Sequence, residues 1–397
     1  MKQHSEADHY GPLPLRRFLG ADVPAGQYGK EALHSEGGFA EVLSLRKIKM
    51  NSMLPNVLKN LRLPVIGAPM FTVSYPELVA AQCKAGIVGS FPALNARPVA
   101  LLDTWLTQLN EELVGYKNKH PERFVGPIAV NQIMHVSNKR LEQDVRVCVQ
   151  HQVPIFITSL RAPIKEILDA VHSYGGIVLH DVISQRHAEK ALEAGVDGLI
   201  LVASGAGGHA GALSPFALVG EVRRFFTGPL VLAGAITTGQ AVLAAQVMGA
   251  DLAYVGTRFI ATQEAHASEQ YKQALVRAQA NEIIYTDYFT GVHGNYVQES
   301  IVHAGLDPKN LSKPETEAMS FVNAEQAEVA KTWKDIWGAG QGVGMITDIP
   351  SVKDVVEQME KDYLASYQAW FERMPSVSPA RKSLHDENKA FCGVRMS

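Results

Sequence analysis

A single histidine stands inside the glycine-rich stretch ASGAGGHAGA, which covers residues 203–212. The stretch follows the apolar run GLILV and precedes a segment of helical periodicity, so His209 lies just beyond the end of a predicted buried strand. Its small neighbours leave room for a ligand. An imidazole titrates near neutral pH and suits proton abstraction or hydrogen bonding to a substrate oxygen. We therefore predict that His209 is catalytic, although a lone histidine is more often a structural or surface residue.

Glycine also ends two later apolar runs, PLVLAG before AITTG and AYVG before TRF. A glycine backbone can approach a ligand closely, and successive N–H groups or a helix N-terminus bind anions. For any one of these segments a tight turn is the simpler interpretation. Taken together, the three strand ends predict one phosphate site, at Gly207, Gly208, Gly234, Ala235, Gly256 and Thr257.

The remaining candidates end other predicted strands. Asn131 ends PIAVN, and its amide can donate and accept hydrogen bonds, which suits the edge of a heterocycle as well as a turn. His180 and Asp181 end IVLHDV and either face the pocket as a pair or bond to the backbone. Met70 ends PVIGAPM and suits packing against a planar ring or within the core. We predict Asn131, His180 and Met70 as ligand contacts.

Other common chemistries lack their motifs. The 14 histidines show no HExxH or similar ligand spacing, so no metal site is expected. SGAGGHAG does not match the GxSxG of hydrolases, and it is a poor match to the dinucleotide fingerprint GxGxxG. The sequence therefore favours a site in which a histidine acts beside a bound compound that carries a phosphate.

Eight short apolar runs supply the strands that would position these residues. Each is bounded by Gly, Pro or Asp, and a continuous apolar run suits a strand buried on both faces of a parallel sheet. Eight such runs, each followed by a helix, predict an α/β fold of the (β/α)8 TIM-barrel type, with functional residues at the carboxyl ends of the strands. A doubly wound open sheet is the alternative. The runs are 64–70, 87–90, 127–131, 154–159, 177–182, 198–203, 229–234 and 253–257.

The segments between the strands have helical periodicity and recognisable ends. Ser184 and Thr238 are placed to cap two of the helices. The joints EAGVDGLILV and VMGADLAYVG both consist of a helix end, a C-cap glycine, an aspartate and a strand, which indicates a weak internal repeat. The helical segments are 76–85, 97–114, 137–150, 163–174, 184–194, 214–226, 238–248 and 262–280.

The pattern divides the chain into three parts. Residues 1–60 are polar and irregular and form a predicted N-terminal extension, and residues 61–280 contain the barrel. Residues 281–397 begin with an aromatic, glycine-punctuated stretch and continue with helical stretches at 312–334 and 352–373. We predict that this third part is a mostly helical cap over the barrel mouth, followed by a polar tail from residue 375.

Composition restricts the compartment and the partners. The chain has 397 residues, 46% of them hydrophobic, and a net charge of -3 with acids and bases interspersed, so neither nucleic acid nor a membrane surface is an expected partner. Three widely spaced cysteines without CxxC favour a reducing cytosol. The N-terminus lacks the apolar core of a signal peptide, and no apolar run approaches the ~20 residues of a membrane span. We expect a cytoplasmic protein.

From about residue 60 to residue 350 the chain resembles the nitronate monooxygenase family, once called 2-nitropropane dioxygenases. The shared elements are PVIGAPM, AGIVGSF, AEKALEAGVDGLILVASGAGGHAG, GADLAYVGTRF and WGAGQGVG, and AGGHxG together with GADxxxxGTRF is specific. The family consists of FMN-dependent TIM-barrel enzymes. The resemblance implies that His209 is the catalytic histidine, that Asn131 contacts FMN and that Met70 lies by the flavin ring. It also implies contacts to the flavin phosphate and ribityl chain from Gly207, Gly234, Tyr254, Val255, Gly256 and Thr257.

The chain departs from the family at two positions. Members commonly have a glutamine at the end of the sixth strand and a glutamate before AGGH, where this chain has Val202 and Gly205. The change removes one flavin hydrogen bond and one charge. In addition, TGVHGNYVQESI is closer to the reductase-like branch of the relatives, which include flavin-dependent enoyl-ACP reductases and NADH:quinone reductases.

These observations lead to three hypotheses about function. The first is FMN-dependent oxidation of alkyl nitronates by O2 to a carbonyl compound and nitrite, with a homodimer as a candidate assembly. The second is an FMN-dependent reductase that uses NAD(P)H on an enoyl thioester or a quinone. The third is a phosphate-binding barrel without flavin, because a fold alone does not determine function.

Overall fold

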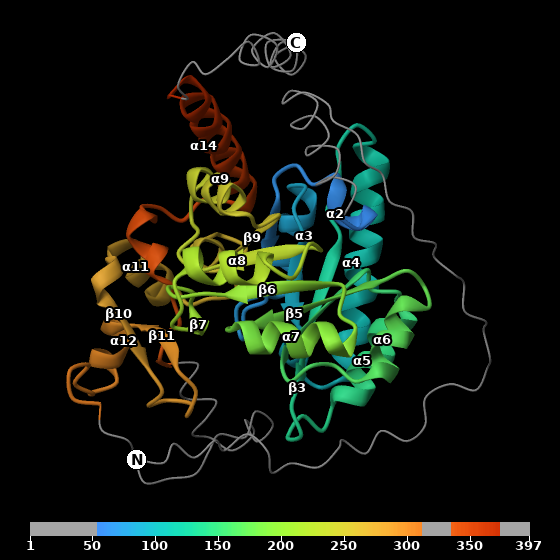
Figure 1. The fold of residues 1–397 in the computed structure, drawn as a ribbon, viewed down its shortest axis with the longest axis horizontal. Helices are drawn as coiled ribbons and strands as arrows, with labels where there is room; N and C mark the ends of the chain where they lie inside the picture. The colour runs from blue at the N-terminus through green and yellow to red at the C-terminus, as the bar shows by residue number, and fades with distance from the viewer. Residues whose placement is uncertain (1–53, 312–334, 374–397) are drawn as a thin grey trace.

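The computed structural model describes residues 54–311 and 335–373. Eight parallel strands form one sheet in the order β1-β9-β8-β6-β5-β4-β3-β2, and a parallel bridge between Ile66 and Val88 joins its two edges. The structure therefore confirms the predicted (β/α)8 barrel (Figure 1). The strands are β1 (Val65–Gly67), β2 (Gly89–Pro92), β3 (Ile128–Met134), β4 (Ile155–Leu160), β5 (Ile177–Val182), β6 (Gly198–Val202), β8 (Leu230–Ala233) and β9 (Leu252–Val255).

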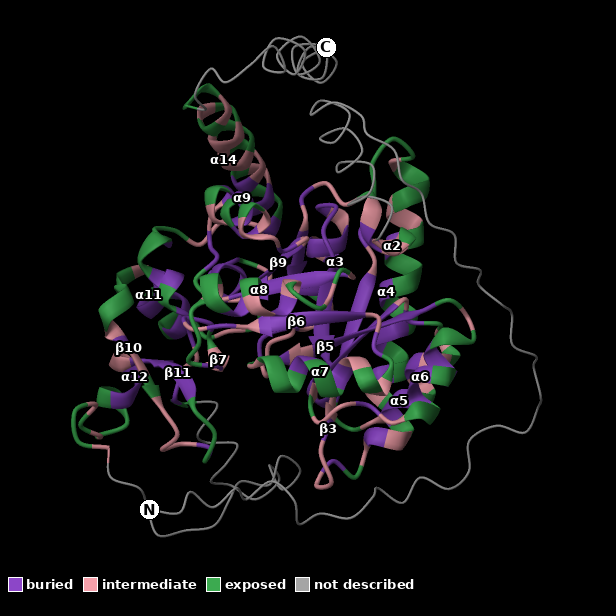
Figure 2. Ribbon diagram, viewed as in Figure 1, coloured by how far each residue is buried: buried purple, intermediate pink, exposed green. Residues whose placement is uncertain are grey.

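Alternate side chains of the strands build two separate cores. One set, which includes Ile157 and Val231, fills the barrel interior, where Leu58 from α2 (Asn56–Lys59) joins it. The other set, which includes Phe156 and Leu199, packs under the outer helices. Figure 2 shows the result as buried strands surrounded by helices that each keep an exposed side. A difference of one position along a strand therefore decides whether a side chain points into the barrel or towards a helix.

Helices surround the barrel, as predicted, but the eighth outer position is filled from far along the chain. The helix α14 (Val352–Arg373) packs against α9 and α3, and its apolar stripe, including Val355 and Met359, is buried there. The sequence prediction assigned this segment to the cap over the mouth, whereas its stripe covers the gap between the last and first helices of the ring. The other outer helices are α3 (Pro76–Lys84), α4 (Ala100–Lys119), α5 (Leu141–Gln150), α6 (Lys165–His172), α7 (Gln185–Ala194), α8 (Pro215–Arg223) and α9 (Gly239–Met248).

The weak sequence repeat corresponds to a repeated hydrogen-bond arrangement. Gly195 and Gly249 end α7 and α9 with left-handed φ angles of 101° and 116°. Two residues later, an Asp197 carboxylate oxygen accepts a 2.7 Å bond from the Val178 N–H, and an Asp251 oxygen accepts a 2.8 Å bond from the Leu230 N–H. Each aspartate thus fastens the start of one strand to the start of the preceding one. The predicted caps are also present, because Ser184 and Thr238 accept bonds from the N–H groups of the first turns.

Replacing Asp251 by Asn should lower the free energy of unfolding by about 2 kcal/mol, because a partly buried ion pair with a 2.7 Å hydrogen bond from Arg223 is lost. Urea unfolding monitored by circular dichroism would measure the change. The matched control is Asp169→Asn, whose partner Lys165 is 79% exposed, and it should cost less than about 0.5 kcal/mol. Equal losses in the two variants would contradict this account of the repeat.

A small lobe lies beside the barrel mouth, built from residues 283–311 and 335–338 together with the segment 208–209. Its antiparallel sheet runs in the order β10-β11-β7, where β7 is the segment Gly208–His209 that leaves the barrel after β6. A separate core of Tyr296, Ile301 and Ile336 supports it. The sequence analysis did not predict these strands. The elements are β10 (Ile283–Thr286), β11 (Gly294–Val297) and α12 (Gln298–His303), preceded in the chain by α10 (Thr257–Ile260) and α11 (Glu269–Arg277).

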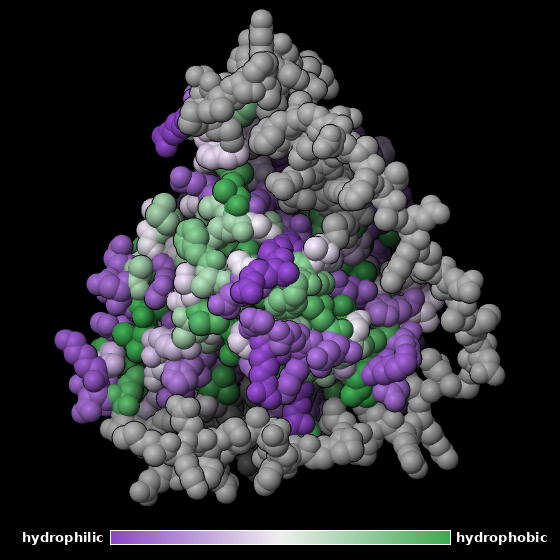
Figure 3. Space-filling model, in the orientation of Figure 1, coloured by the Kyte–Doolittle hydropathy of each residue, from purple (hydrophilic) through white to green (hydrophobic). Residues whose placement is uncertain are grey.

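Several predicted segments lie outside the described residues, namely 1–53, the helical stretch 312–334 and the tail from 375. Over the part of the surface drawn in Figure 3, hydrophilic side chains gather over α7, with apolar patches between them and the neighbouring helices. Within the described ranges, no helix combines the length and the apolar character that a membrane crossing requires.

Candidate active site

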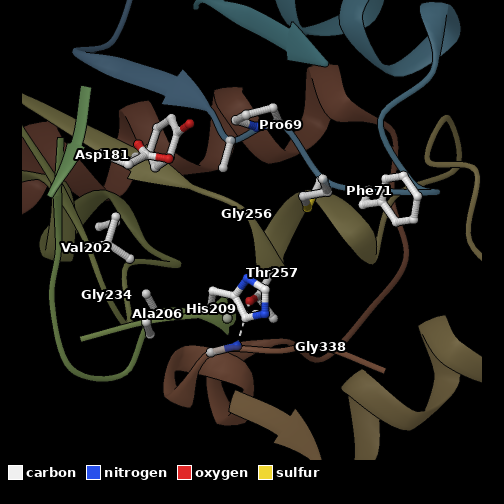
Figure 4. A pocket seen from close by; sticks show the side chains of 18 of the residues that line it. Pro69, Phe71, Asp181, Val202, Ala206, His209, Gly234, Gly256, Thr257 and Gly338 are labelled. Carbon is white, nitrogen blue, oxygen red and sulfur yellow. Dashed lines mark hydrogen bonds between the residues drawn. The ribbon is translucent and has the colours of Figure 1, made fainter. Parts of the chain in front are cut away.

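A cavity of about 430 Å³ opens at the carboxyl ends of the barrel strands. Figure 4 shows Asp181 from β5, Val202 from β6 and His209 from β7 around it. It is lined by most of the predicted site residues, whose roles as ligand contacts stay predictions. They are His209, Met70, Asn131, Gly207, Gly208, Gly234, Ala235, Tyr254, Gly256 and Thr257.

His180 and Val255 are the two predicted contacts that the structure does not bring to the cavity. Both alternate with residues that do line it, Asp181 and Tyr254, and therefore point towards the helix layer. The His180 Nδ1 atom lies 2.8 Å from the hydroxyl oxygen of Thr158 on β4. We assign His180 to the packing between barrel and helices, and Asp181 takes its expected place in the pocket.

His180 should make the fold sensitive to acid. Burial, and secondly the charge of His187, lowers the pKa of His180 from 6.5 to about 4. The unfolded chain then binds a proton near pH 6.5 and the folded chain only near pH 4, so stability falls as pH drops through that window. At pH 4 the loss is about 3 kcal/mol. Urea unfolding at pH 7 and pH 4.5 should show a smaller acid loss in His180→Asn than in the wild type; equal losses would assign the effect to other groups.

His209 is held at the cavity wall by the lobe. Strand β7 pairs with β11, with His209 opposite Gly294, and the His209 Nε2 atom lies 2.9 Å from the Thr290 hydroxyl oxygen. That hydroxyl donates its own hydrogen to the Val292 carbonyl at 2.8 Å, so it accepts from the Nε2–H of His209. The lone pair of the neutral imidazole is then on Nδ1. Burial lowers the pKa of His209 to about 4, which keeps the ring neutral at physiological pH.

The glycines of the mouth allow three loops to interlock. The carbonyl of Gly205 accepts bonds from the N–H groups of Ala235 and Gln341, at 3.2 and 2.9 Å. A Cβ at Gly340 would lie 2.5 Å from the Gly205 oxygen, and one at Gly207 would lie 2.8 Å from the Gly340 nitrogen. Neither Gly207 nor Gly340 therefore has room for a side chain. This close approach brings the WGAGQGVG stretch, residues 337–344, to the barrel mouth. Its Gly340 N–H also donates a 2.9 Å bond to the Thr257 hydroxyl.

Backbone strain collects at the same place. Four non-glycine residues in the described ranges have positive φ angles, and three of them, Thr72, Leu160 and Ala235, line the cavity. Such conformations cost of order 1–3 kcal/mol each and persist where the surrounding structure holds them. Leu160 is also 44% exposed. The strained backbone is therefore concentrated at the cavity, which is the behaviour expected of a functional site.

Sequence reasoning missed Thr290 and left the role of Asp181 open, whereas Tyr254 was among the predicted flavin contacts. Thr290 lies 81 residues from His209 in the chain, and no local pattern relates them. One carboxylate oxygen of Asp181 and the Tyr254 hydroxyl are buried without a hydrogen-bond partner. Asp181 lies two residues beyond Leu179, which points into the barrel, and therefore faces the same side of β5; the sequence alone carried no signal for this direction. None of the described cavity-lining residues is Lys or Arg, and no cluster of three or more metal-ligating side chains occurs among the described residues.

The barrel and its glycine-lined mouth place the chain among the (β/α)8-barrel enzymes. Within that class it belongs to the nitronate monooxygenase family, whose sequence profile matches residues 55–362. It is 25% identical to a nitronate monooxygenase of Paraburkholderia phytofirmans over 343 residues, which are 77% of this chain and 93% of that protein. A probable nitronate monooxygenase of Staphylococcus haemolyticus is 23% identical, over 72% of this chain and 90% of its own length.

Solved structures share the fold. A nitroalkane oxidase from Streptomyces ansochromogenes superposes with a TM-score of 0.63 at 22% identity, over 79% of this chain and 99% of its own. FabK from Thermotoga maritima superposes with a TM-score of 0.64 at 23% identity, over 80% of this chain and 98% of its own. At these sequence identities the two structural similarities establish the fold alone.

Proposed function

We propose that this chain is an FMN-dependent enzyme that oxidises alkyl nitronates with O2 to a carbonyl compound and nitrite. The observation that carries the proposal is His209, a neutral imidazole held by Thr290 at the wall of the strand-end cavity, in a chain of the nitronate monooxygenase family. The barrel interior beneath is closed by packed side chains. Substrate and cofactor therefore meet at the mouth.

The mouth suits a flavin mononucleotide in both of its parts. The loops after β8 and β9 offer backbone and hydroxyl groups at Gly234, Ala235, Gly256 and Thr257, and a helix start, for a phosphate. A Cβ at Gly256 would lie 3.6 Å from the Met70 sulfur, in ordinary van der Waals contact, so a side chain there would occupy part of the cavity beside Met70. One Asp181 carboxyl oxygen and the Tyr254 hydroxyl have no hydrogen-bond partner in the described chain and could bond to the polar edge of the flavin ring. FMN, when bound, supplies the electron transfer to O2.

The protein's own contribution is to orient the substrate and to move one proton. His209 is uncharged, so its imidazole can accept a proton from the α-carbon of a neutral nitroalkane, or hold the oxygen of a nitronate. The rim next to it is apolar: Leu160, Ile183 and Val292 line the cavity and are each more than 40% exposed. Such a rim suits the alkyl part of the substrate and excludes water from it.

Thr290 is expected to position His209 rather than to touch the substrate. Thr290→Val removes the acceptor of the Nε2–H and keeps the shape of the side chain, so the ring loses its fixed tautomer and turnover should fall about 10-fold. Thr290→Ser keeps the hydroxyl and is the matched control. Steady-state kinetics with an alkyl nitronate would measure both. Equal rates in Val and Ser variants would contradict the positioning role.

The test of the proposed function is oxygen consumption by the FMN-loaded protein supplied with an alkyl nitronate and no NAD(P)H. Rapid O2 uptake with release of nitrite supports the proposal. Absence of both, from protein that retains its flavin, overturns it.

The second candidate is an FMN-dependent reductase that takes electrons from NAD(P)H and passes them to an enoyl thioester or a quinone. It is favoured by Val202 and Gly205, which stand where the family commonly has glutamine and glutamate. Both residues line the cavity, so the departures lie within the site. Rapid anaerobic bleaching of the bound flavin by NADH would select this candidate, and failure to bleach would remove it.

A further inference from the structure

Two polar side chains on the cavity wall lack partners. One Asp181 carboxylate oxygen and the Tyr254 hydroxyl are shielded from solvent and make no hydrogen bond within the described part of the chain. Tyr254 is only 9% exposed, and both residues line the cavity, from β9 and β5. An unsatisfied buried polar group costs about 1–3 kcal/mol, so native proteins keep few of them. Two in the lining of one cavity indicate a ligand that satisfies them.

The two groups lie close enough to influence each other, and burial favours the protonated form of both. Burial raises the pKa of the Asp181 carboxyl to about 7. Burial, and secondly the charge of Asp181, raises the pKa of the Tyr254 hydroxyl well above 10. A neutral carboxylic acid and a phenol each carry one O–H donor. The cavity lining therefore presents two hydrogen-bond donors, one from β5 and one from β9.

No cation in the described cavity lining favours the ionised form of Asp181. The titratable groups that share the cavity are His187 from α7, His209 from β7 and Tyr271 from α11. Burial is the first cause that lowers the pKa values of His187 and His209, which disfavours the cationic form of both imidazoles. The neighbouring strands β4 and β6 contribute Ser159 and Val202, which do not titrate.

We propose that Asp181, as the neutral acid, and Tyr254 donate hydrogen bonds to the heterocyclic ring of the flavin and stabilise the negative charge that the ring gains on reduction. This inference rests on the proposed FMN dependence. Tyr254 belongs to the side chains that fill the barrel interior, and Asp181 follows Leu179 of the same set by two residues, so both lie beneath the strand-end loops proposed to hold the phosphate. A neutral flavin ring that gains two electrons and one proton would carry one negative charge, which is shared over its N1–C2=O edge. Paired donors in an apolar site are an arrangement that stabilises such an oxyanion.

The experiment is an anaerobic redox titration of bound FMN against a reference dye, on the full chain between pH 6 and pH 9. Tyr254→Phe removes one donor and keeps the aromatic side chain. The protein should then bind reduced FMN about 10-fold less tightly relative to oxidised FMN, which lowers the two-electron potential of the flavin by about 30 mV. Asp181→Asn keeps a donor but does not ionise. Its potential should match the wild type at pH 6 and lie above it beyond pH 7, where the wild-type carboxyl loses its proton.

The control is Tyr174→Phe, whose hydroxyl bonds to the Val153 carbonyl at 2.8 Å away from the cavity, and it should leave the potential unchanged. Wild-type potentials in Tyr254→Phe, or parallel pH profiles of Asp181→Asn and wild type, would overturn the inference while FMN binding and turnover stand. A wild-type chain that takes up no FMN would overturn the proposed function and this inference together.

Discussion

Replacing His209 by asparagine should leave FMN bound and lower the turnover of a neutral nitroalkane by about 10²–10⁴-fold, the usual contribution of a general base. The asparagine amide still offers hydrogen bonds but does not accept a proton from carbon. The corresponding nitronate has already lost that proton, so its oxidation should fall much less. The flavin absorbance of the purified variant and kinetics with both substrates would measure the three quantities.

The comparison between the two substrates separates two roles of His209. An equal loss on nitroalkane and nitronate would show that the imidazole orients the substrate and does not act as a base. The wild-type pH profile gives an independent check. Because burial lowers the pKa of His209 to about 4, the neutral form is present throughout the range above pH 5, and this group should cause no fall in rate between pH 6 and pH 8.

Replacing Gly239 by alanine should detach the last helix from the barrel. A Cβ at this position would lie 1.8 Å from the Met359 carbonyl oxygen and 2.4 Å from the Tyr363 nitrogen, both of which belong to the backbone of α14. A helix backbone does not yield as a flexible side chain does, so α14 has to move and its buried apolar stripe is exposed. We expect a loss of about 3 kcal/mol or more in the free energy of unfolding.

The matched control is Gly220→Ala, in the middle of α8, where a Cβ would meet nothing within 4 Å. That substitution should stabilise the helix by up to about 1 kcal/mol. Urea unfolding would compare the two variants, and limited proteolysis would show whether cleavage in the first falls within α14. A Gly239→Ala protein as stable as the Gly220→Ala protein would contradict the packing described for this helix.

The barrel could be predicted from the sequence because its signals are local. Each strand is a short apolar run bounded by Gly, Pro or Asp, and two of the helices have clear caps, Ser184 with Gly195 and Thr238 with Gly249. Asn131 and the glycine-rich strand ends were placed correctly at the cavity for the same reason, since the carboxyl ends of parallel strands all open on one face.

The direction of individual side chains was not available from the sequence. A strand buried on both faces shows no alternation of apolar and polar residues, so IVLHDV does not reveal whether His180 or Asp181 points inward. The structure selects Asp181. The partner of His209 was equally hidden, because Thr290 reaches it only through the pairing of β7 with β11, two elements distant in the chain. The strands of the lobe are only two to four residues long, and β7 consists of Gly208 and His209 alone, so they carry little local signal.

The place of α14 in the outer ring has a consequence for how the protein is made. A chain leaving the ribosome completes all eight strands by residue 255, yet the groove between α9 and α3 stays open until residues 352–373 have emerged. During that interval the nascent barrel shows an apolar strip to the surrounding medium, the kind of surface that chaperones bind and that promotes aggregation. A messenger RNA truncated just before the codons of α14 should therefore yield a protein that chaperones and proteases recognise, even though every residue of the candidate active site has already been translated.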